Sequence, residues 1–190
     1  MNLKTIGMII VVAVCMGFMT SAASAALISI GDGSETPWAT TTVNITADAG
    51  DLANFDITVT YDPDVVVVTN AANDPTFGTP INNLEDAANG TVRLASLNTG
   101  SGETGDNILL STLTIEVVGT PWETSDLTLT INELLNSSED NIDADTDNGT
   151  FTITQPVISI SDGSADAGAT TTVNITADAG DLANFDITVT

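Results

Sequence analysis

The sequence has very few of the side chains that enzymes use for chemistry near neutral pH. Its 190 residues include no histidine, one cysteine (Cys15) and two basic residues, Lys4 and Arg93. Cys15 and Lys4 lie in an N-terminal segment that we expect to be removed. The remainder has only carboxylates and hydroxyls, so catalysis by His, Cys or Lys is excluded. A carboxylate pair can hydrolyse glycosides, but aromatic rings for a sugar are scarce, at 4% of residues. We expect no catalytic residues.

The first 25 residues have the pattern of a signal peptide. Lys4 is followed by an apolar run over 6–19 and by small residues that end in Ala23-Ser24-Ala25, a typical cleavage site. The run is short for a membrane span, although an uncleaved anchor is the alternative. We therefore expect a secreted or cell-surface protein with no membrane insertion after signal removal. Without Cys15 no disulfide can form, so the fold depends on an apolar core.

The charge is strongly one-sided. The chain has 26 acidic residues and a net charge of −24, which becomes −25 when Lys4 is removed. Such a surface repels nucleic acids and anionic membranes, so neither is an expected partner. It is typical either of a protein adapted to salt or of a surface that attracts cations or a basic partner.

An internal repeat divides the chain. Residues 27–60 and 157–190 are identical at 28 of 34 positions, with an offset of 130 residues. We expect one domain over 26–154, a linker at 155–156 and the start of a second repeat over 157–190. The second piece is too short to bury a core alone. The parent protein is then longer, or its reading frame is truncated, or these strands pair with the sheet edge of another chain.

Alternating apolar and polar residues predict β-strands throughout the first unit. The alternation has period two and no segment has clear helical periodicity, apart from a possible helical turn at 82–88. Residues 65–68 read as a strand covered on both sides. Turn residues separate the strands at Asp62-Pro63, Asn89-Gly90 and 100–105. About nine short strands predict an all-β, two-sheet sandwich of the jelly-roll or Greek-key kind. The predicted inward residues are Val43, Ile45, Ala47, Ala53, Phe55, Ile57, Val59, Tyr61, Leu113, Ile115, Val117, Leu127, Leu129, Ile131, Phe151 and Ile153.

One segment resembles a known family. Residues 50–65, GDLANFDITVTYDPDV, combine a small-residue loop, an Ala-Asn-x-Asp strand, Tyr-Asp-Pro and an aliphatic strand. This order is similar to cohesin domains, the scaffold modules that capture dockerin-bearing proteins in polysaccharide breakdown. The resemblance implies a nine-stranded jelly roll without an active site. It also implies a flat binding face to which Asn54, Asp56 and Thr58 contribute. Alternation independently turns these three side chains outward, where they offer amide donors and carboxylate acceptors. A merely solvated strand face is the alternative.

Two tryptophans lie in matching Thr-Pro-Trp-x-Thr contexts. Trp38 and Trp122 could stack on a sugar or anchor a partner, and packing at a loop is the alternative. The second unit has Gly168 in place of Trp38. These residues motivate a carbohydrate-binding module as one rival hypothesis, with polysaccharide as a further partner. The other rival is a structural spacer repeat of a surface layer or adhesin.

Two weaker patterns concern metal and glycan. Asp143, Asp145 and Asp147 are spaced like the first ligands of a calcium loop, but Gly149 falls one place late and no glutamate closes the loop. An acidic hairpin is the simpler interpretation, so we expect no cofactor and no metal site. Asn-x-Ser/Thr sequons give a capacity for glycosylation. They begin at Asn44, Asn89, Asn136, Asn148 and Asn174.

Overall fold

The computed structural model describes residues 25–98 and 100–178. Almost all of the regular structure is β, as expected. In chain order the elements are β1 (Ala26–Ile30), β2 (Gly33–Glu35), β3 (Thr40–Thr60), β4 (Val66–Asn73), the 3₁₀ turn η1 (Pro75–Phe77), β5 (Thr79–Pro80), the 3₁₀ turn η2 (Ala87–Asn89), β6 (Thr91–Leu97), β7 (Glu103–Val117), β8 (Thr124–Asn136), β9 (Ala144–Asp147), β10 (Gly149–Ile153), β11 (Val157–Ile160) and β12 (Ile175–Asp178). The predicted signal peptide (1–25) lies outside the described residues except for Ala25, and so do the last twelve residues of the second repeat (179–190).

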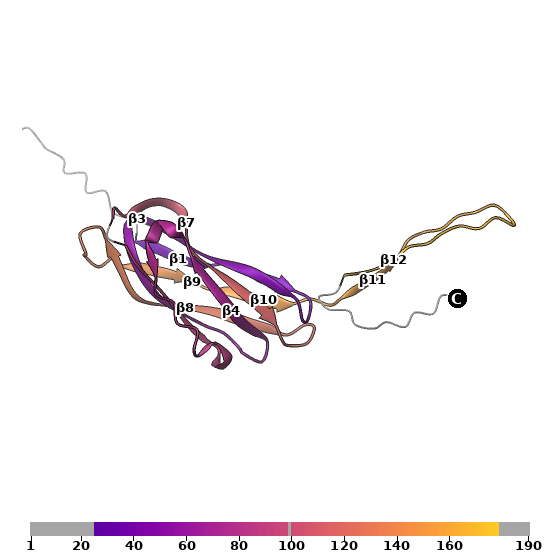
Figure 1. Ribbon diagram of the computed structural model, residues 1–190, viewed down its shortest axis with the longest axis horizontal. Helices are drawn as coiled ribbons and strands as arrows, with labels where there is room; N and C mark the ends of the chain where they lie inside the picture. Colours follow the sequence, from indigo (N-terminus) through magenta and orange to yellow (C-terminus); the bar gives the residue numbers. More distant parts are fainter. Residues whose placement is uncertain (1–24, 99, 179–190) are drawn as a thin grey trace, which may run out of the picture.

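The long strand β3 belongs to both layers of a sandwich (Figure 1). Its first half pairs with β1 and β7, and its second half pairs with β6 and β8. The register shifts between Ala47 and Leu52, where Asp51 takes a left-handed φ of 60°. One layer therefore runs β9-β1-β3-β7-β4 and the other β2-β10-β8-β3-β6-β5. This irregularity lets one strand cross between sheets, as β-bulges do at the corners of sandwiches.

The core lies between these layers and confirms the alternation. Fifteen of the sixteen predicted inward residues are buried, and Ile131 is half-buried against the core. The rings of Phe55 and Phe77 meet edge to face, with centroids 5.4 Å apart, a favourable geometry for two aromatic rings. Phe77 reaches the core from η1. The inner face of β3 is thus fixed by packing, which leaves its alternate residues on the surface.

The Tyr-Asp-Pro segment (61–63) connects the end of β3 to β4 and η2 through hydrogen bonds. The buried Tyr61 hydroxyl donates to the Ala87 carbonyl at 2.7 Å and accepts from the Val68 N–H at 3.2 Å. The Asp62 carbonyl accepts from the Val65 N–H, which closes the predicted turn. The Tyr61 N–H donates to the carbonyl of Gly90 at 2.9 Å, and Gly90 has the left-handed φ of 78° that glycine favours.

Three local predictions need correction. The 100–105 loop is shorter than expected because β7 begins at Glu103, where it pairs with the corner of β3. The expected helical turn at 82–88 is a 3₁₀ turn at Ala87–Asn89. Val67 is only half-buried because β4 is an edge strand bonded to β7 alone. Beyond the predicted alternation, a bulge in β8 around Asn132 places Leu134 in the core.

The second repeat forms a separate two-stranded sheet. β11 and β12 pair in the register that β1 and β3 use, so Ile158 faces Ala177 just as Ile28 faces Ala47. Ile158 is 50% exposed, whereas Ile28 is fully buried. The identical residues therefore pair with each other as in the first repeat, but no second sheet of the described residues covers their apolar side chains. Figure 1 shows this hairpin beyond the end of the sandwich.

Candidate partner-binding face

The outward residues of β3 lie in the middle of one sheet face, which we call the partner face: the outer side of β5, β6, β3 and β8. Asn54, Asp56 and Thr58 are half-buried there, and the intervening Phe55 and Ile57 point into the core. This placement confirms the predicted outward orientation of all three side chains. Pairing with β8 along the whole row, and with β6 from Asp56 onward, holds them in place.

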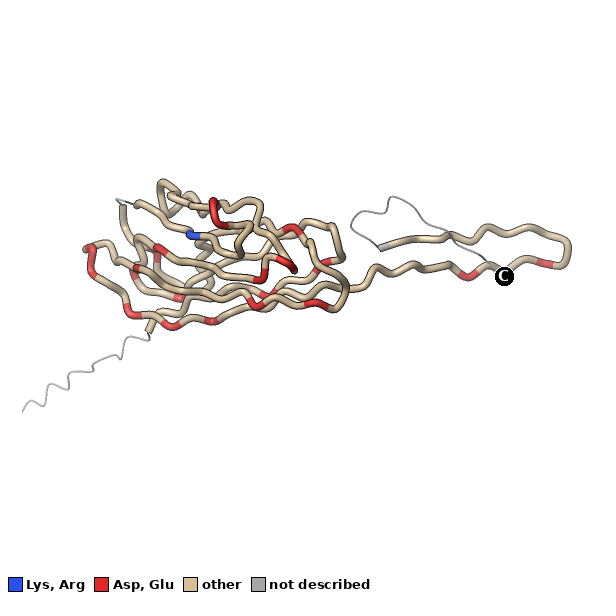
Figure 2. The backbone as a smooth tube through the Cα atoms, turned by 90° about the horizontal axis from the view of Figure 1, so that it is seen from below, with Lys and Arg blue, Asp and Glu red and all other residues tan. Residues whose placement is uncertain are grey.

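A basic residue that the sequence analysis did not single out occupies the centre of the partner face. Arg93 of β6 donates from Nε to Asp56 Oδ1 at 2.8 Å and from Nη2 to Asp56 Oδ2. Asn132 of the β8 bulge donates from Nδ2 to Asp56 Oδ1 at 3.0 Å and to Thr58 Oγ1 at 2.9 Å. Arg93 is the only basic residue in the described part of the chain, and its isolation stands out in Figure 2. The network joins three strands through side chains.

These contacts set the charge state of the pair. The hydrogen bond from Arg93 is the main cause that holds the pKa of the Asp56 carboxyl below its ordinary value, although partial burial opposes the shift. The same contact raises the pKa of Arg93. Both groups are therefore charged at neutral pH. Asp56 then offers a partner less free acceptor capacity than the sequence suggested.

Asn54 keeps its amide donor available. Its Oδ1 accepts the N–H of Asn98 at 2.6 Å, which ties the end of β6 to β3. No described residue accepts a hydrogen bond from Asn54 Nδ2. This amide group therefore points two donors at the surface of the partner face.

The partner face is hollowed around these residues. A depression of about 810 Å³ is lined by Asn54, Asp56 and Arg93 together with apolar and acidic side chains. Its apolar members include Ile81 and Leu97, each 56% exposed, and the half-buried Leu135. Its acidic members other than Asp56 are Glu133 and Glu139. Thr58 is not among the residues that line the hollow, although its register partner Arg93 is. Exposed apolar groups beside fixed polar groups are typical of an interaction surface.

Of the remaining sequence-predicted residues, only Asn136 lines the hollow. Trp38 and Trp122 are not among the residues that line the hollow. Asn44, Asn89, Asn148 and Asn174 are exposed away from it. Asn136 is half-buried at its rim, where its Oδ1 accepts from the N–H groups of Ser138 and Asp140. In the described ranges, no group of three or more acidic, His or Cys side chains could hold a metal, and this includes Asp143, Asp145 and Asp147.

Solved structures with this architecture are cohesins. One is the complex of the Clostridium acetobutylicum cohesin CaCohA2 with the dockerin CaDoc0917, at TM-score 0.61 and 17% identity over 68% of this chain and 100% of that one. A second is a non-cellulosomal cohesin from the archaeon Archaeoglobus fulgidus, with a TM-score of 0.60 and 19% identity over 70% of this chain and 93% of that one. A third is the sixth cohesin of Acetivibrio cellulolyticus scaffoldin B, bound to a Cel5 dockerin. Its TM-score is 0.60, with 15% identity over 68% of this chain and 99% of that one.

The sandwich has the cohesin fold. This agrees with the resemblance seen in residues 50–65, and the matches cover 93% to 100% of the length of these cohesins. No protein-family model matches the sequence, and no curated protein matches it either. Among the described residues, no helix is long and apolar enough to cross a membrane.

Proposed function

We propose that the first domain is a non-catalytic module that captures a dockerin-bearing protein through the partner face. The observation that carries the proposal is the hollow in this face, where Asn54 and the Asp56–Arg93 pair lie beside exposed Ile81 and Leu97. Exposed apolar side chains beside fixed polar groups fit a protein–protein interface. Two of the cohesins with this fold were solved with a dockerin bound.

The charge pattern of the hollow suggests what the partner offers. Glu133 and Glu139 are exposed at its edge and carry no basic neighbour among the described residues. These carboxylates would attract a partner helix that carries Lys or Arg. Salt screens this attraction, so its range shortens as the salt concentration rises. Asn54 Nδ2 would donate to a partner carbonyl or hydroxyl. The module acts outside the cell, either secreted or on the cell surface, because the chain begins with a predicted signal peptide.

The test is a binding screen of the chain from residue 26 against dockerin domains encoded in the same genome. Binding should be one-to-one, and the double variant Asn54→Ala/Asp56→Ala should weaken it at least tenfold. The matched control is Asn44→Ala/Asp48→Ala, because both of these residues are exposed on the other half of the same strand. The control should bind as the parent does.

Two results would count against the proposal. If no dockerin binds, the module is better explained as a structural spacer, which the tandem repeat and its conserved β1–β3-type pairing also suit. If a dockerin binds but both double variants weaken binding equally, the partner face is not the binding site.

A further inference from the structure

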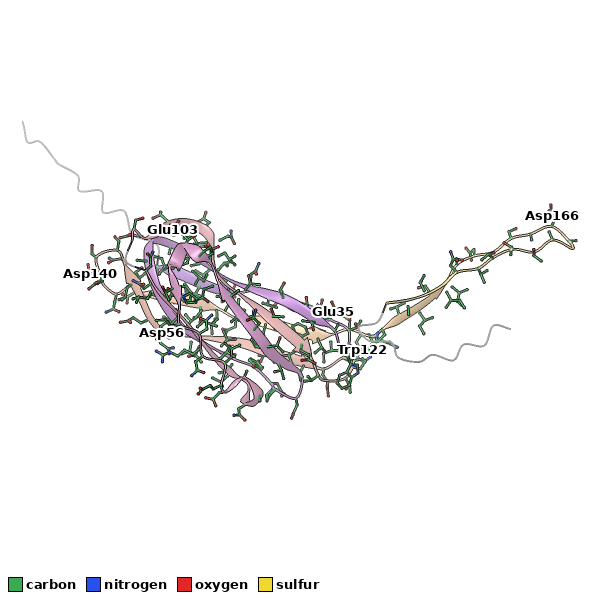
Figure 3. The ribbon with its side chains drawn as sticks, viewed as in Figure 1. Glu35, Asp56, Glu103, Trp122, Asp140 and Asp166 are labelled. Atoms are coloured by element: carbon green, nitrogen blue, oxygen red, sulfur yellow. The ribbon has the colours of Figure 1, made fainter. Side chains whose placement is uncertain are left out.

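Two exposed tryptophans project from turns at the end of the sandwich that leads into β11. Trp38 lies between β2 and β3 and is 63% exposed, and Trp122 lies between β7 and β8 and is 73% exposed. Figure 3 shows Trp122 beside Glu35 at this end, with Asp140, which neighbours the rim of the hollow, at the other end. The pair is therefore separate from the partner face.

Both tryptophans occupy the same position of the same turn. The fourth residue of each turn donates its N–H to the first residue's carbonyl, at 3.3 Å in Thr36–Ala39 and 3.2 Å in Thr120–Glu123. Proline is second and tryptophan third, with φ of 66° for Trp38 and 76° for Trp122. This is the pattern of a type II turn, whose third position needs a positive φ and therefore favours glycine. A bulky aromatic residue is unusual there.

The second repeat shows that the turn does not need the indole. Asp166–Ala169 forms the corresponding turn, in which the Ala169 N–H donates to the Asp166 carbonyl at 2.9 Å. Its third residue is Gly168, with φ of 86°. Glycine thus makes the turn without strain, and Trp38 makes it with strain. Strained residues that do not serve packing are candidates for function.

The backbone under both rings is held firmly. The turn around Trp38 exchanges two backbone hydrogen bonds with Val117, at 3.1 and 3.0 Å. The turn around Trp122 does the same with Ile153, at 2.9 and 2.9 Å. The two turns are linked, because Ile153 pairs with Glu35 in the β10–β2 register and the Thr154 N–H donates to the Glu35 carbonyl at 2.8 Å. The rings therefore start from adjacent, fixed backbone, which lowers the entropy lost on binding.

The surroundings of the rings favour a small, neutral ligand surface over a protein. The other large apolar residues exposed on the sandwich are Ile81 and Leu97, and both lie in the hollow. A stable protein interface covers about 800 Å² on each partner around a desolvated centre, and two isolated rings do not provide that centre. An indole face does match the apolar face of one sugar ring. The net charge excludes anionic polymers.

Two carboxylates beside the rings can accept from sugar hydroxyls. Glu35 Oε1 accepts the Thr36 N–H at 2.8 Å, and Glu123 Oε2 accepts the Thr120 N–H at 2.6 Å. These bonds orient each carboxylate. The second oxygen of each has no hydrogen-bond donor among the described residues, so it is available to a hydroxyl group.

We propose that the Trp38 and Trp122 turns form a binding site for a neutral polysaccharide, independent of the partner face. Each indole stacks on a sugar ring, and Glu35 and Glu123 accept hydrogen bonds from hydroxyls. The module would then hold a neutral glycan at one end and its protein partner on a sheet face.

Tryptophan fluorescence tests the site directly, because the chain has no other tryptophan. The chain from residue 26 is mixed with microcrystalline cellulose, chitin, xylan and mannan in pull-downs, and with soluble oligosaccharides of each in fluorescence titrations. At least one glycan should remove the protein from solution and shift or quench the emission. Binding should persist in 1 M NaCl, because stacking on a neutral ligand does not depend on charge.

Glycine variants supply the control for folding. Trp38→Gly and Trp122→Gly each place the favoured residue at a positive φ, so the Tm should equal or exceed that of the parent, while glycan affinity falls at least tenfold. Trp38→Asn is the second variant, because asparagine also tolerates this backbone. Asn54→Ala/Asp56→Ala should leave glycan binding unchanged. The proposal is overturned if none of the four polymers binds, or if the folded Trp38→Gly/Trp122→Gly double variant binds as the parent does.

Discussion

Arg93 of β6 and Asp56 of β3 form a two-pronged ion pair at the centre of the partner face. Arg93 lies opposite Thr58 in the β3–β6 register, so it reaches Asp56 diagonally across the sheet. The Asp56 side chain is 16% exposed and that of Arg93 is 59% exposed. A carboxylate shielded in this way needs its partner. The pair therefore fixes the shape and charge of the centre of the partner face in the free domain.

The ion pair predicts a specific pH dependence of stability. Arg93→Gln should be less stable than the parent at pH 7, by a small amount because Arg93 is exposed to solvent screening. The Asp56 pKa is lowered from 3.8 in the folded state, mainly by Arg93. The ion pair therefore contributes its full stabilisation of the folded state above about pH 3.8. This stabilisation is lost as the pH falls through the lower pKa that Asp56 has in the folded state. Urea denaturation between pH 7 and pH 2 measures the difference between the two proteins.

The control for that experiment removes the titrating group. In an Asp56→Asn background, Arg93→Gln should have the same effect at every pH. A difference between parent and Arg93→Gln that is constant from pH 7 to pH 2 would show that the ion pair does not stabilise the fold.

Most of the fold, and part of the site, followed from local sequence. Alternation placed Phe55 and Ile57 inside and Asn54 and Asp56 outside, because side chains on a strand alternate between its two sides. This needs no knowledge of neighbouring strands. The Tyr-Asp-Pro turn was likewise local, since its proline and aspartate act on their own backbone.

The rest depends on how distant segments align. Arg93 is 37 residues from Asp56, and only the β3–β6 register brings them together. Asn132 reaches Asp56 because of a bulge in β8 that no residue pattern announces. Ile81 and Leu97 were not predicted as site residues, because nothing in the neighbouring sequence shows that their side chains are exposed. That Arg93 is the only basic residue left in an acidic chain was nevertheless a usable signal, because a single cation tends to pair with one of the many carboxylates.

Tyr61 predicts a measurable cost for losing one hydroxyl group. Tyr61→Phe should lower the free energy of unfolding by about 1–3 kcal/mol, because the Ala87 carbonyl and Val68 N–H would lose their partner. The aromatic ring stays, so core packing is preserved. Chemical denaturation measures the change. A loss below about 0.5 kcal/mol, the range of ordinary surface changes, would mean that water replaces the hydroxyl.

Gly90 predicts a larger cost for a single methyl group. A Cβ at Gly90 would meet the Tyr61 carbonyl oxygen at 2.3 Å, and the backbone there has φ of 78°. Gly90→Ala should therefore destabilise the domain by about 2 kcal/mol or more, from steric overlap and backbone strain together. Gly31→Ala is the matched control, because its Cβ would meet nothing closer than the Asn44 carbonyl at 3.8 Å. Thermal unfolding should show a clear fall in Tm for Gly90→Ala and little change for Gly31→Ala.

The acidic surface predicts that salt stabilises the fold. The chain carries 26 carboxylates and few cations, and Figure 2 shows the acidic residues distributed around the sandwich. Their mutual repulsion disfavours the compact state. Added salt shortens the screening length from about 30 Å at 0.01 M to about 3 Å at 1 M, so the Tm should rise steeply with NaCl and then level off. NaCl and KCl should act alike at equal ionic strength, since screening does not distinguish these cations. A Tm that is flat between 0.01 M and 1 M NaCl would show that the carboxylates are spaced widely enough not to repel one another.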